Sequence, residues 1–426
     1  MTFEALNLMP ILPEIVLLAL ACSILLIDVF MRSGSRDVTY WLTQLTLVAT
    51  FVTVLSGMSM DQRLSFDGSV INDPLSDLMK LSMILLTSMA FALSRSYLKD
   101  RDIHKGEYYI LGLFGLLGMM IMASAYSLLL VYLGLELMSL AMYAMVAIHR
   151  DDIRASEAAM KYFVLGALAS GLLLYGMSLL YGVTGSLDIA VIRQAVLGGD
   201  IPEYALLMAM LFMLTGLIFK LGAAPFHMWL PDVYDGAPTA VTLYLSSAPK
   251  IAALALLLRL FGDGLIGILP DWQVLMIVFA VASLFVGNVI AIAQTSFKRM
   301  LAYSTVSHVG FILLGVLSGT ADGFSAALFY TLAYGLMSLG GFGIITYLAS
   351  RGIEADQLDD LKGLNDRSPW MAFILLIMMF SMAGIPFTLG FWAKLAVLQA
   401  VVEVDLVWLA VYAVVMSVIG AFYYLR

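Results

Sequence analysis

Charged side chains are scarce in this sequence of 426 residues: only 12% are Asp, Glu, Lys or Arg, whereas 62% are apolar. A soluble domain has about 25% charged residues and about 45–50% apolar ones. A mean hydropathy of +0.98 over the whole chain excludes a soluble domain with a single anchor, and so much apolar surface excludes a disordered chain. The composition predicts a protein that crosses a membrane many times.

Residues and motifs that hold metals and cofactors are also scarce. The single cysteine, Cys22, cannot by itself form an intramolecular disulfide, a cysteine zinc site or an iron–sulfur cluster. The four histidines (His104, His149, His227 and His308) never form an H-x-x-x-H pair. No G-x-G-x-x-G follows a predicted strand and no G-x-x-x-x-G-K-[ST] is present. We therefore expect no metal and no cofactor in this chain, and the net charge of −8 argues against a nucleic-acid partner.

Apolar runs close to the ~20 residues that a transmembrane helix needs recur along the whole chain. Only helices and closed barrels satisfy the backbone in hydrocarbon, and the alternating segments of a barrel are missing. The sequence predicts an all-α polytopic membrane protein with about thirteen transmembrane helices, at 12–31, 38–59, 74–93, 108–125, 126–148, 158–182, 204–224, 239–260, 272–294, 299–318, 323–349, 369–401 and 405–425.

Loop charge predicts the orientation of these helices. The amino terminus lacks the basic segment of a cleaved signal peptide, and we place it on the outer, periplasmic side. The outer loops then hold only Arg63 and Arg193, which is a strong positive-inside bias. The remaining loop cations fall on the cytoplasmic side: Arg32, Arg36, Arg95, Lys99, Arg101, Lys105, Arg150, Arg154, Lys298, Arg299, Arg351, Lys362, Arg367 and Arg426.

Ionisable side chains deep in the predicted spans are candidate functional groups, because each costs at least ~2.5–3.5 kcal/mol at the bilayer centre. Lys250 lies in mid-span, Lys220 directly precedes the segment LGAAPF, and Lys394 follows GIPFTLGFWA. Glu136 is the only carboxylate in the middle of a predicted span. A lone buried carboxylate is protonated and inert, whereas one beside a lysine can hold charge and exchange protons. The alternative for Glu136 is a neutral acid that hydrogen-bonds a neighbouring helix.

Other ionisable groups have a stronger structural alternative. His308 lies in mid-span and titrates near physiological pH, but it can equally be a hydrogen-bonded core histidine. Lys161 follows Glu157 by four residues, a common surface pair, so structural and functional interpretations stay open. We expect Lys80 and Arg259 to reach the headgroups or to pair locally with Asp77 and Asp263.

Two spans contain Pro and Gly in their interior, in KLGAAPFHMWLP (220–231) and AGIPFTLGFWAK (383–394). Proline removes a helical hydrogen bond, and the freed carbonyls are tolerated in lipid only where protein or cavity water satisfies them. A pair of interrupted helices in corresponding halves is typical of transporters. We predict two inverted five-helix repeats, with broken helices seven and twelve, and the domain boundaries 1–107, 108–260 and 261–426.

The run GLIFKLGAAPFHMWLPDVYDGAPTAVTLYLSSAPKIAALALLLRLF resembles the antiporter-like membrane subunits of respiratory complex I, the NADH–quinone oxidoreductase. Within that family, PDVYDGAP followed by APK, SFKRMLAYSTVSHVGFILLG and MAGIPFTLGFWAKLAVLQA resemble the subunit N branch. The resemblance covers nearly the whole chain. The family norm is fourteen helices, so we expect the last one to be missing from this chain.

The resemblance implies a role in proton transfer for six side chains. Glu136 would be the glutamate of helix five, Lys220 the lysine of the broken helix seven, and Lys250 the lysine that links the two halves. His308 would lie on the central axis, Lys394 would face the proton exit and Lys161 would lie near the cytoplasmic entry. The six side chains are Glu136, Lys161, Lys220, Lys250, His308 and Lys394.

The function implied is proton translocation across a bacterial inner membrane, coupled to electron transfer from NADH to quinone. NAD, FMN, iron–sulfur clusters and quinone would belong to other subunits. The expected partners are the lipid bilayer, the M-like antiporter subunit and the small K-, J- and A-like membrane subunits. Two alternatives remain: a subunit of a multi-protein Na⁺/H⁺ antiporter, and a structural membrane-arm subunit whose buried charges only hold helices together.

Overall fold

The structure is a computed structural model that describes residues 7–31, 36–199, 201–349 and 354–426. Arg32 and Arg351 of the predicted cytoplasmic loops lie outside the described residues. The long helices are α1 (Leu12–Phe30), α2 (Arg36–Gly57), α3 (Pro74–Asp100), α4 (Gly106–Ser124), α5 (Leu128–Val146), α6 (Ile153–Thr184), α8 (Glu203–Leu221), α12 (Leu269–Ile292), α13 (Phe297–Leu317), α14 (Ala321–Leu348) and α18 (Val407–Leu425). The described part of the chain contains 12 helices or helical runs that are long and apolar enough to cross a membrane. This confirms an all-α polytopic membrane protein.

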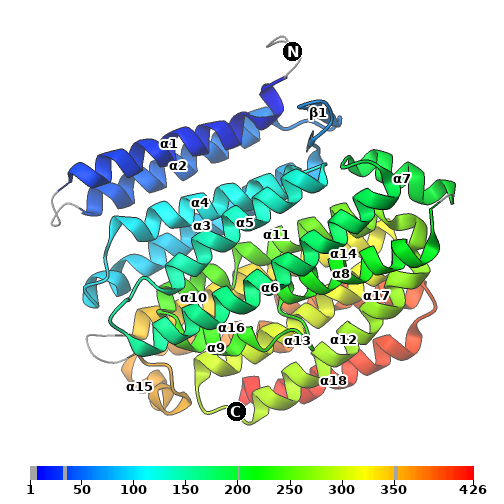
Figure 1. Ribbon diagram of the computed structural model, residues 1–426. Helices are drawn as coiled ribbons and strands as arrows, with labels where there is room; N and C mark the ends of the chain where they lie inside the picture. Colours follow the sequence, from blue (N-terminus) through cyan, green and yellow to red (C-terminus); the bar gives the residue numbers. More distant parts are fainter. Residues whose placement is uncertain (1–6, 32–35, 200, 350–353) are drawn as a thin grey trace.

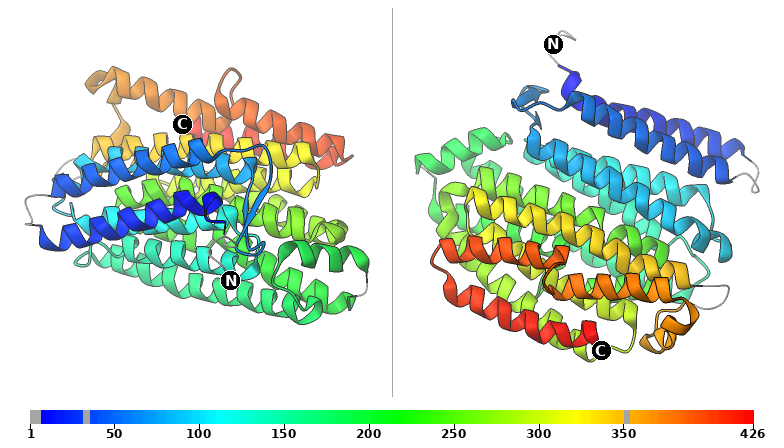
Figure 2. Two further views of the ribbon diagram at one scale, coloured as in Figure 1. Left: turned by 90° about the horizontal axis from the view of Figure 1, so that it is seen from above. Right: turned by 180° about the vertical axis from the view of Figure 1, so that it is seen from behind.

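The helices run roughly alongside one another, with α1 and α2 at one edge of the bundle and α18 at the opposite edge (Figures 1 and 2). The helices between these edges are almost completely buried. In the apolar 18-residue stretch of Thr239–Gly264, 94% is buried inside the protein, and the same share is buried in α13. By contrast, only 33% of the corresponding stretch of the first span, Met9–Phe30, is buried. Buried polar side chains such as Lys250 and His308 therefore lie in the central helices.

Loops that were predicted to share a side of the membrane meet in the structure. On the outer side, the hydroxyl of Tyr126 donates to Asp263 at 2.7 Å and Asn7 donates to the carbonyl of Leu64 at 3.2 Å. On the other side, Arg426 donates to the carbonyl of Gln294 at 2.7 Å. These contacts agree with the predicted alternation of the helices, while the assignment of one side to the cytoplasm stays a prediction.

Both predicted breaks are present and have the same local geometry. The seventh span ends as α8 and resumes as α9 (Trp229–Gly236), and the twelfth consists of α16 (Pro369–Ala383) and α17 (Leu389–Glu403). Gly222 follows α8 with φ +82°, and Gly384 follows α16 with φ +84°, a backbone conformation that glycine adopts at little cost. The halves α16 and α17 have 15 residues each and are joined by a bend (Figure 2). The predicted span 369–401 is therefore not one continuous helix.

The sequence did not predict an interruption in the eighth span. This span consists of α10 (Thr239–Leu245) and α11 (Ala248–Leu257), and it ends in the π-helical turn η4 (Leu258–Gly264). The interruption at Ser246–Ser247 lies less than one turn before Lys250. The other elements outside the predicted spans are β1 (Arg63–Ser65), β2 (Val70–Asn72), α7 (Ile189–Gly198), α15 (Leu364–Arg367) and the 3₁₀ turns η2 (Met9–Ile11), η5 (Ile266–Ile268) and η6 (Leu358–Leu361).

Candidate functional site

Lys220, near the end of α8, points at α5. Its ammonium donates to the Ser139 hydroxyl at 2.8 Å and to the Tyr143 hydroxyl at 3.3 Å. Glu136 lies on the same helix as these two hydroxyls and interacts electrostatically with Lys220, but no ion pair joins the two side chains. Its Oε1 is buried and has no hydrogen-bond partner among the residues that the structure describes. The structure therefore places Glu136 near Lys220 without a direct bond.

Lys250 binds the backbone at the end of α8. Its side chain is 2% exposed, and its ammonium donates to the carbonyl oxygen of Leu221 at 2.7 Å. The ammonium also lies 5.5 Å from the ring centre of Trp229, whose indole N–H donates to the carbonyl of Phe219 at 2.9 Å. Because Leu221 directly follows Lys220, the Lys250 ammonium binds the backbone next to Lys220 at the end of α8.

Lys394 has the same relation to the second break. Its ammonium donates to the carbonyl oxygens of Met382 at 3.1 Å and Ala383 at 2.8 Å, which are the last residues of α16, and to the Ser417 hydroxyl of α18 at 2.8 Å. A Cβ atom on Gly384 would lie 2.8 Å from the Lys394 side chain, so the lysine packs directly on the glycine. Each broken helix thus has at least one carbonyl oxygen at its end bound by a buried ammonium, and an interruption in lipid requires such partners.

His308 is 2% exposed and both its ring nitrogens are hydrogen-bonded. Nδ1 lies 2.7 Å from the Tyr330 hydroxyl and Nε2 lies 3.0 Å from the Tyr424 hydroxyl. Lys394 interacts with His308 electrostatically, but no direct bond joins them. The histidine is therefore satisfied within the core, as the structural alternative requires, and it is also part of a continuous polar chain.

Lys161 lies apart from the other predicted residues, in a network of ion pairs. Its ammonium contacts Glu157 and Asp232, each at 2.9 Å, and Arg299 of α13 contacts the other oxygen of Asp232 at 3.0 Å. Asp235, one turn after Asp232 on α9, lies 3.5 Å from Arg154 and accepts a hydrogen bond from Ser296. The network joins α6 and α9 to α13, across the predicted boundary between the two repeats.

The prediction for Arg259 was wrong, and the prediction for Lys80 missed its direct partner, although Lys80 also interacts electrostatically with Asp77. Lys80 is fully buried and its ammonium lies 2.7 Å from Glu14 of α1. Arg259 is 5% exposed and donates to both oxygens of Asp73, at 2.8 and 2.7 Å, and to the carbonyl of Ala123. Helix packing brings distant carboxylates to these cations, which removes the need to reach the headgroups.

Several of these partners could have been found from spacing. Ser139 and Tyr143 stand three and seven residues after Glu136, so the three side chains share one face of α5. Asp232 and Asp235 lie within the motif that carries the family resemblance. Glu14 and Asp73 had no such signal, because their partners lie more than sixty residues away.

The chain matches the family described as NADH:quinone oxidoreductase/Mrp antiporter, TM, over residues 125–420. The match covers most of the chain, including both broken helices. The chain therefore belongs to this family of membrane subunits.

The chain is also similar to individual relatives and to chains of solved structures. The chain is 59% identical to NADH-quinone oxidoreductase subunit N of Thioalkalivibrio sulfidiphilus (strain HL-EbGR7), over 100% of this chain and 89% of the relative. Among solved structures, respiratory complex I from Thermus thermophilus with bound aureothin contains a chain with 32% identity and a TM-score of 0.83, covering 97% of this chain and 88% of that one. The Mrp complex from Dietzia sp. DQ12-45-1b matches with a TM-score of 0.83 and 23% identity, over 100% of this chain and 79% of that one. At that identity the likeness concerns the fold alone.

Proposed function

We propose that this chain is a proton-translocating membrane subunit of an NADH:quinone oxidoreductase. The identity of 59% with a curated subunit N, over the full length of this chain, supports this proposal. The observation that carries it is the pair of broken helices whose free carbonyls are bound by Lys250 and Lys394. Buried ionisable groups at interrupted helices are the arrangement typical of ion sites in transporters.

The chemistry assigned to this chain is proton transfer only. NAD, FMN, iron–sulfur clusters and quinone belong to other subunits in this proposal. The partners would be other membrane subunits, namely the M-like antiporter subunit and the K-, J- and A-like small subunits. The location would be a bacterial inner membrane, with the amino terminus in the periplasm.

The proposed mechanism switches the charge state of Lys220. A carboxylate close to an ammonium stabilises the charged form, whereas desolvation favours the neutral amine. When Glu136 moves toward Lys220, the lysine holds its proton. When Glu136 withdraws or is neutralised, the proton passes through water to Lys250, which lies at the same end of α8, and then toward Lys394.

The energy scale of this switch is set by the membrane. Moving one charge across ~100 mV costs about 2.3 kcal/mol. The interaction between Glu136 and Lys220 has to change by a comparable amount between the two states. A carboxylate oxygen without a hydrogen-bond partner, as in Glu136, is free to make that change without first breaking a bond.

The test is proton uptake by sealed vesicles that contain the intact complex, measured together with NADH oxidation. We expect Glu136→Gln and Lys220→Ala to lower the number of protons moved per NADH while NADH oxidation is retained. Glu107→Gln is the matched control, because Glu107 is an exposed carboxylate in the first turn of α4. Variants that weaken assembly of the complex but leave protons per NADH unchanged would support the structural alternative instead.

The Na⁺/H⁺ antiporter alternative has a separate test. It predicts sodium-dependent proton movement in vesicles that lack any redox partner. The proposal predicts no such activity and a strict dependence of proton uptake on NADH oxidation. The two outcomes exclude each other.

A further inference from the structure

A second group of buried ionisable side chains lies outside both predicted repeats, between α1 and α3. The Lys80 ammonium of α3 lies 2.7 Å from Oε1 of Glu14 on α1. Asp77 precedes Lys80 by three residues on the same face of α3 and interacts electrostatically with both Lys80 and Glu14. Glu14, Asp77 and Lys80 are 4%, 2% and 0% exposed. Two carboxyl groups and one amine thus form one buried cluster.

This cluster of Glu14, Asp77 and Lys80 contains one carboxyl group more than it has cations. Arg259, the cation of the neighbouring buried pair, binds both oxygens of Asp73. Among the described residues, Lys80 is the only cation that forms an ion pair with Glu14, and no cation forms one with Asp77. Full ionisation would leave a net charge of −1 buried, which is costly. One proton on either carboxyl group makes the cluster neutral.

Two opposing effects make such a proton exchangeable. Glu14 and Asp77 both lie in the first turn of their helices, where the helix dipole stabilises a negative charge. Burial and a second carboxylate nearby favour the protonated acid instead. Oε2 of Glu14 is buried and has no hydrogen-bond partner among the residues that the structure describes. This oxygen is therefore available to bind the proton.

The cluster contacts the loops of the predicted outer side. Asn72 of β2 donates to Oδ1 of Asp77 at 2.6 Å, and the backbone N–H of Ser59, in the partly exposed segment after α2, also interacts with Asp77. The strands β1 and β2 contact η2, the turn directly before α1, at the end of the bundle where the amino terminus lies (Figure 1). A proton on Asp77 is thus next to the loops that face the outer aqueous phase.

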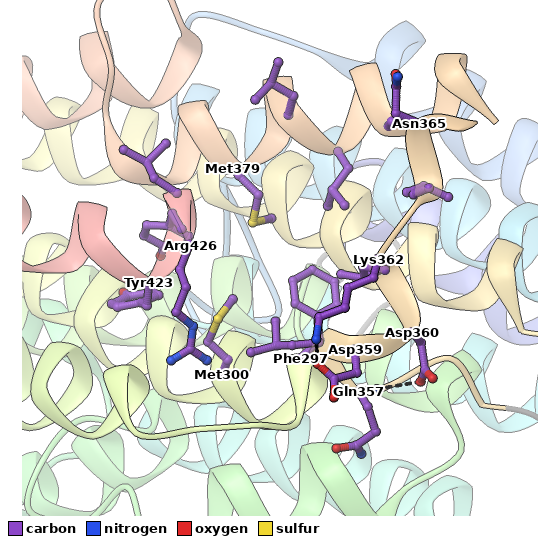
Figure 3. Close-up of a pocket in the computed structure, with 18 of the residues that line it drawn as sticks. Phe297, Met300, Gln357, Asp359, Asp360, Lys362, Asn365, Met379, Tyr423 and Arg426 are labelled. Carbon is purple, nitrogen blue, oxygen red and sulfur yellow. Dashed lines mark hydrogen bonds and ion pairs between the residues drawn. The ribbon is translucent and has the colours of Figure 1, made fainter. Parts of the chain in front are cut away.

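An exposed ion pair shows what sets this cluster apart. Figure 3 shows Lys362 and Asp359 beside a cavity of about 1130 Å³. Their charged atoms are 2.7 Å apart, as are those of Lys80 and Glu14, but the two side chains are 78% and 82% exposed. The hydrogen bond from Lys362 lowers the pKa of the Asp359 carboxyl, which lies outside the membrane spans. Water screens this pair, whereas the excess carboxyl group of the buried cluster needs a proton.

We propose that Glu14, Asp77 and Lys80 form a proton-binding site that releases one proton to the predicted outer side during turnover. In the loaded state one carboxyl group is protonated and the other balances the ammonium, so the net charge is zero. On release the carboxyl O–H bond breaks, the proton passes to water, and the cluster carries a charge of −1 until a proton returns. The binding of this proton is independent of the proposed function, whereas its use in translocation rests on that function.

Infrared difference spectra of the intact complex, recorded between low and high pH, test whether the cluster holds a proton. We expect a band of a protonated carboxyl group, shifted in heavy water, that Glu14→Gln and Asp77→Asn each remove or shift. Asp61→Asn is the matched control and should keep the band, because Asp61 is an exposed carboxylate of the loop between α2 and α3. If all three variants keep the wild-type bands, the cluster holds no exchangeable proton. A band that responds to sodium at fixed pH would also contradict the proposal.

Sealed vesicles with the intact complex test whether this proton is used. The triple variant Glu14→Gln, Asp77→Asn and Lys80→Met removes every charge of the cluster and so leaves no buried charge without its partner. We expect it to lower protons per NADH at retained NADH oxidation, while Asp61→Asn keeps the ratio. A cluster that only holds α1 to α3 gives a different pattern: Glu14→Gln lowers the thermal midpoint of the complex, and the triple variant recovers the midpoint and keeps the ratio.

The outcomes separate this site from the proposed function. If Lys220→Ala lowers protons per NADH and the triple variant does not, the outer site takes no part in translocation, and the proposed function stands. If neither Lys220→Ala nor the triple variant changes the ratio, the proposed function is wrong as well.

Discussion

The Lys394 ammonium of α17 donates to the carbonyl oxygen of Ala383, the last residue of α16, at 2.8 Å. The lysine thus closes the break in its own span by binding back across it. At the first break the same bond, to Leu221, comes from Lys250 on the following span. The two lysines are therefore equivalent by what they bind, although they stand at different places relative to Gly222 and Gly384.

This relation predicts that Lys394→Met destabilises the fold as well as stopping proton transfer. The variant removes the ammonium donor of two buried carbonyl oxygens: Ala383 keeps a bond from the Ser417 hydroxyl at 3.3 Å, whereas Met382 loses its donor. An unsatisfied buried polar group costs about 1–3 kcal/mol. Lys220→Met should cost less, because the hydroxyls of Ser139 and Tyr143 lose only a donor, and Ser139 keeps its own bond to the carbonyl of Leu135. Thermal unfolding of the purified complex compares the two, and equal midpoints would contradict the assigned difference.

Ser139→Ala should impair proton transfer without removing any ionisable group. The Lys220 ammonium donates to two hydroxyls, Ser139 at 2.8 Å and Tyr143 at 3.3 Å. In Ser139→Ala only the hydroxyl of Tyr143 is left. Loss of one hydrogen bond to a charged group corresponds to about 1.5–3 kcal/mol. We expect fewer protons per NADH in sealed vesicles at retained NADH oxidation. Ser170→Ala, at a buried serine of α6 with no hydrogen-bond partner among the described residues, is the control that should leave this ratio unchanged.

The ion-pair network around Asp232 should tolerate the loss of one cation but not of both. Lys161 and Arg299 bind different oxygens of this carboxylate. Exposed ion pairs are worth about 0–1 kcal/mol each, so Lys161→Ala or Arg299→Ala alone should have a small effect on proton uptake. The double variant leaves Asp232 without either cation, and its loss should exceed the sum of the two single losses. Additive losses would mean that the two cations act independently of Asp232.

The buried pair of Arg259 and Asp73 should behave in the opposite way. Arg259→Met leaves a carboxylate that is only 6% exposed without its bidentate partner. Breaking a buried pair by removing one member costs about 3–5 kcal/mol. Replacing both, as in Arg259→Met with Asp73→Leu, should recover much of the lost stability, because no charge is left buried. The yield and thermal midpoint of the assembled complex measure this, and a double variant as unstable as Arg259→Met would refute the explanation.

Much of the site was visible in the sequence. Lys220, Lys250 and Lys394 stood out because an ammonium in an apolar run is costly, and Gly222 and Gly384 stood out because glycine and proline interrupt helices. The structure brings Lys220 and Lys250 to one helix end and Lys394 to the other break. The roles of all six side chains in proton transfer stay predictions, as do the inverted relation of the repeats and the domain boundaries.

The sequence by itself determined that this chain is a bundle of membrane helices and where two of them break, because composition, run length and glycine–proline breaks are local properties. Only the tertiary structure decided which groups meet. It paired Lys80 with Glu14 and Arg259 with Asp73, and it placed His308 between two tyrosines from α14 and α18. Such contacts depend on how helices far apart in the chain pack, and a buried charge takes whichever partner that packing brings within reach.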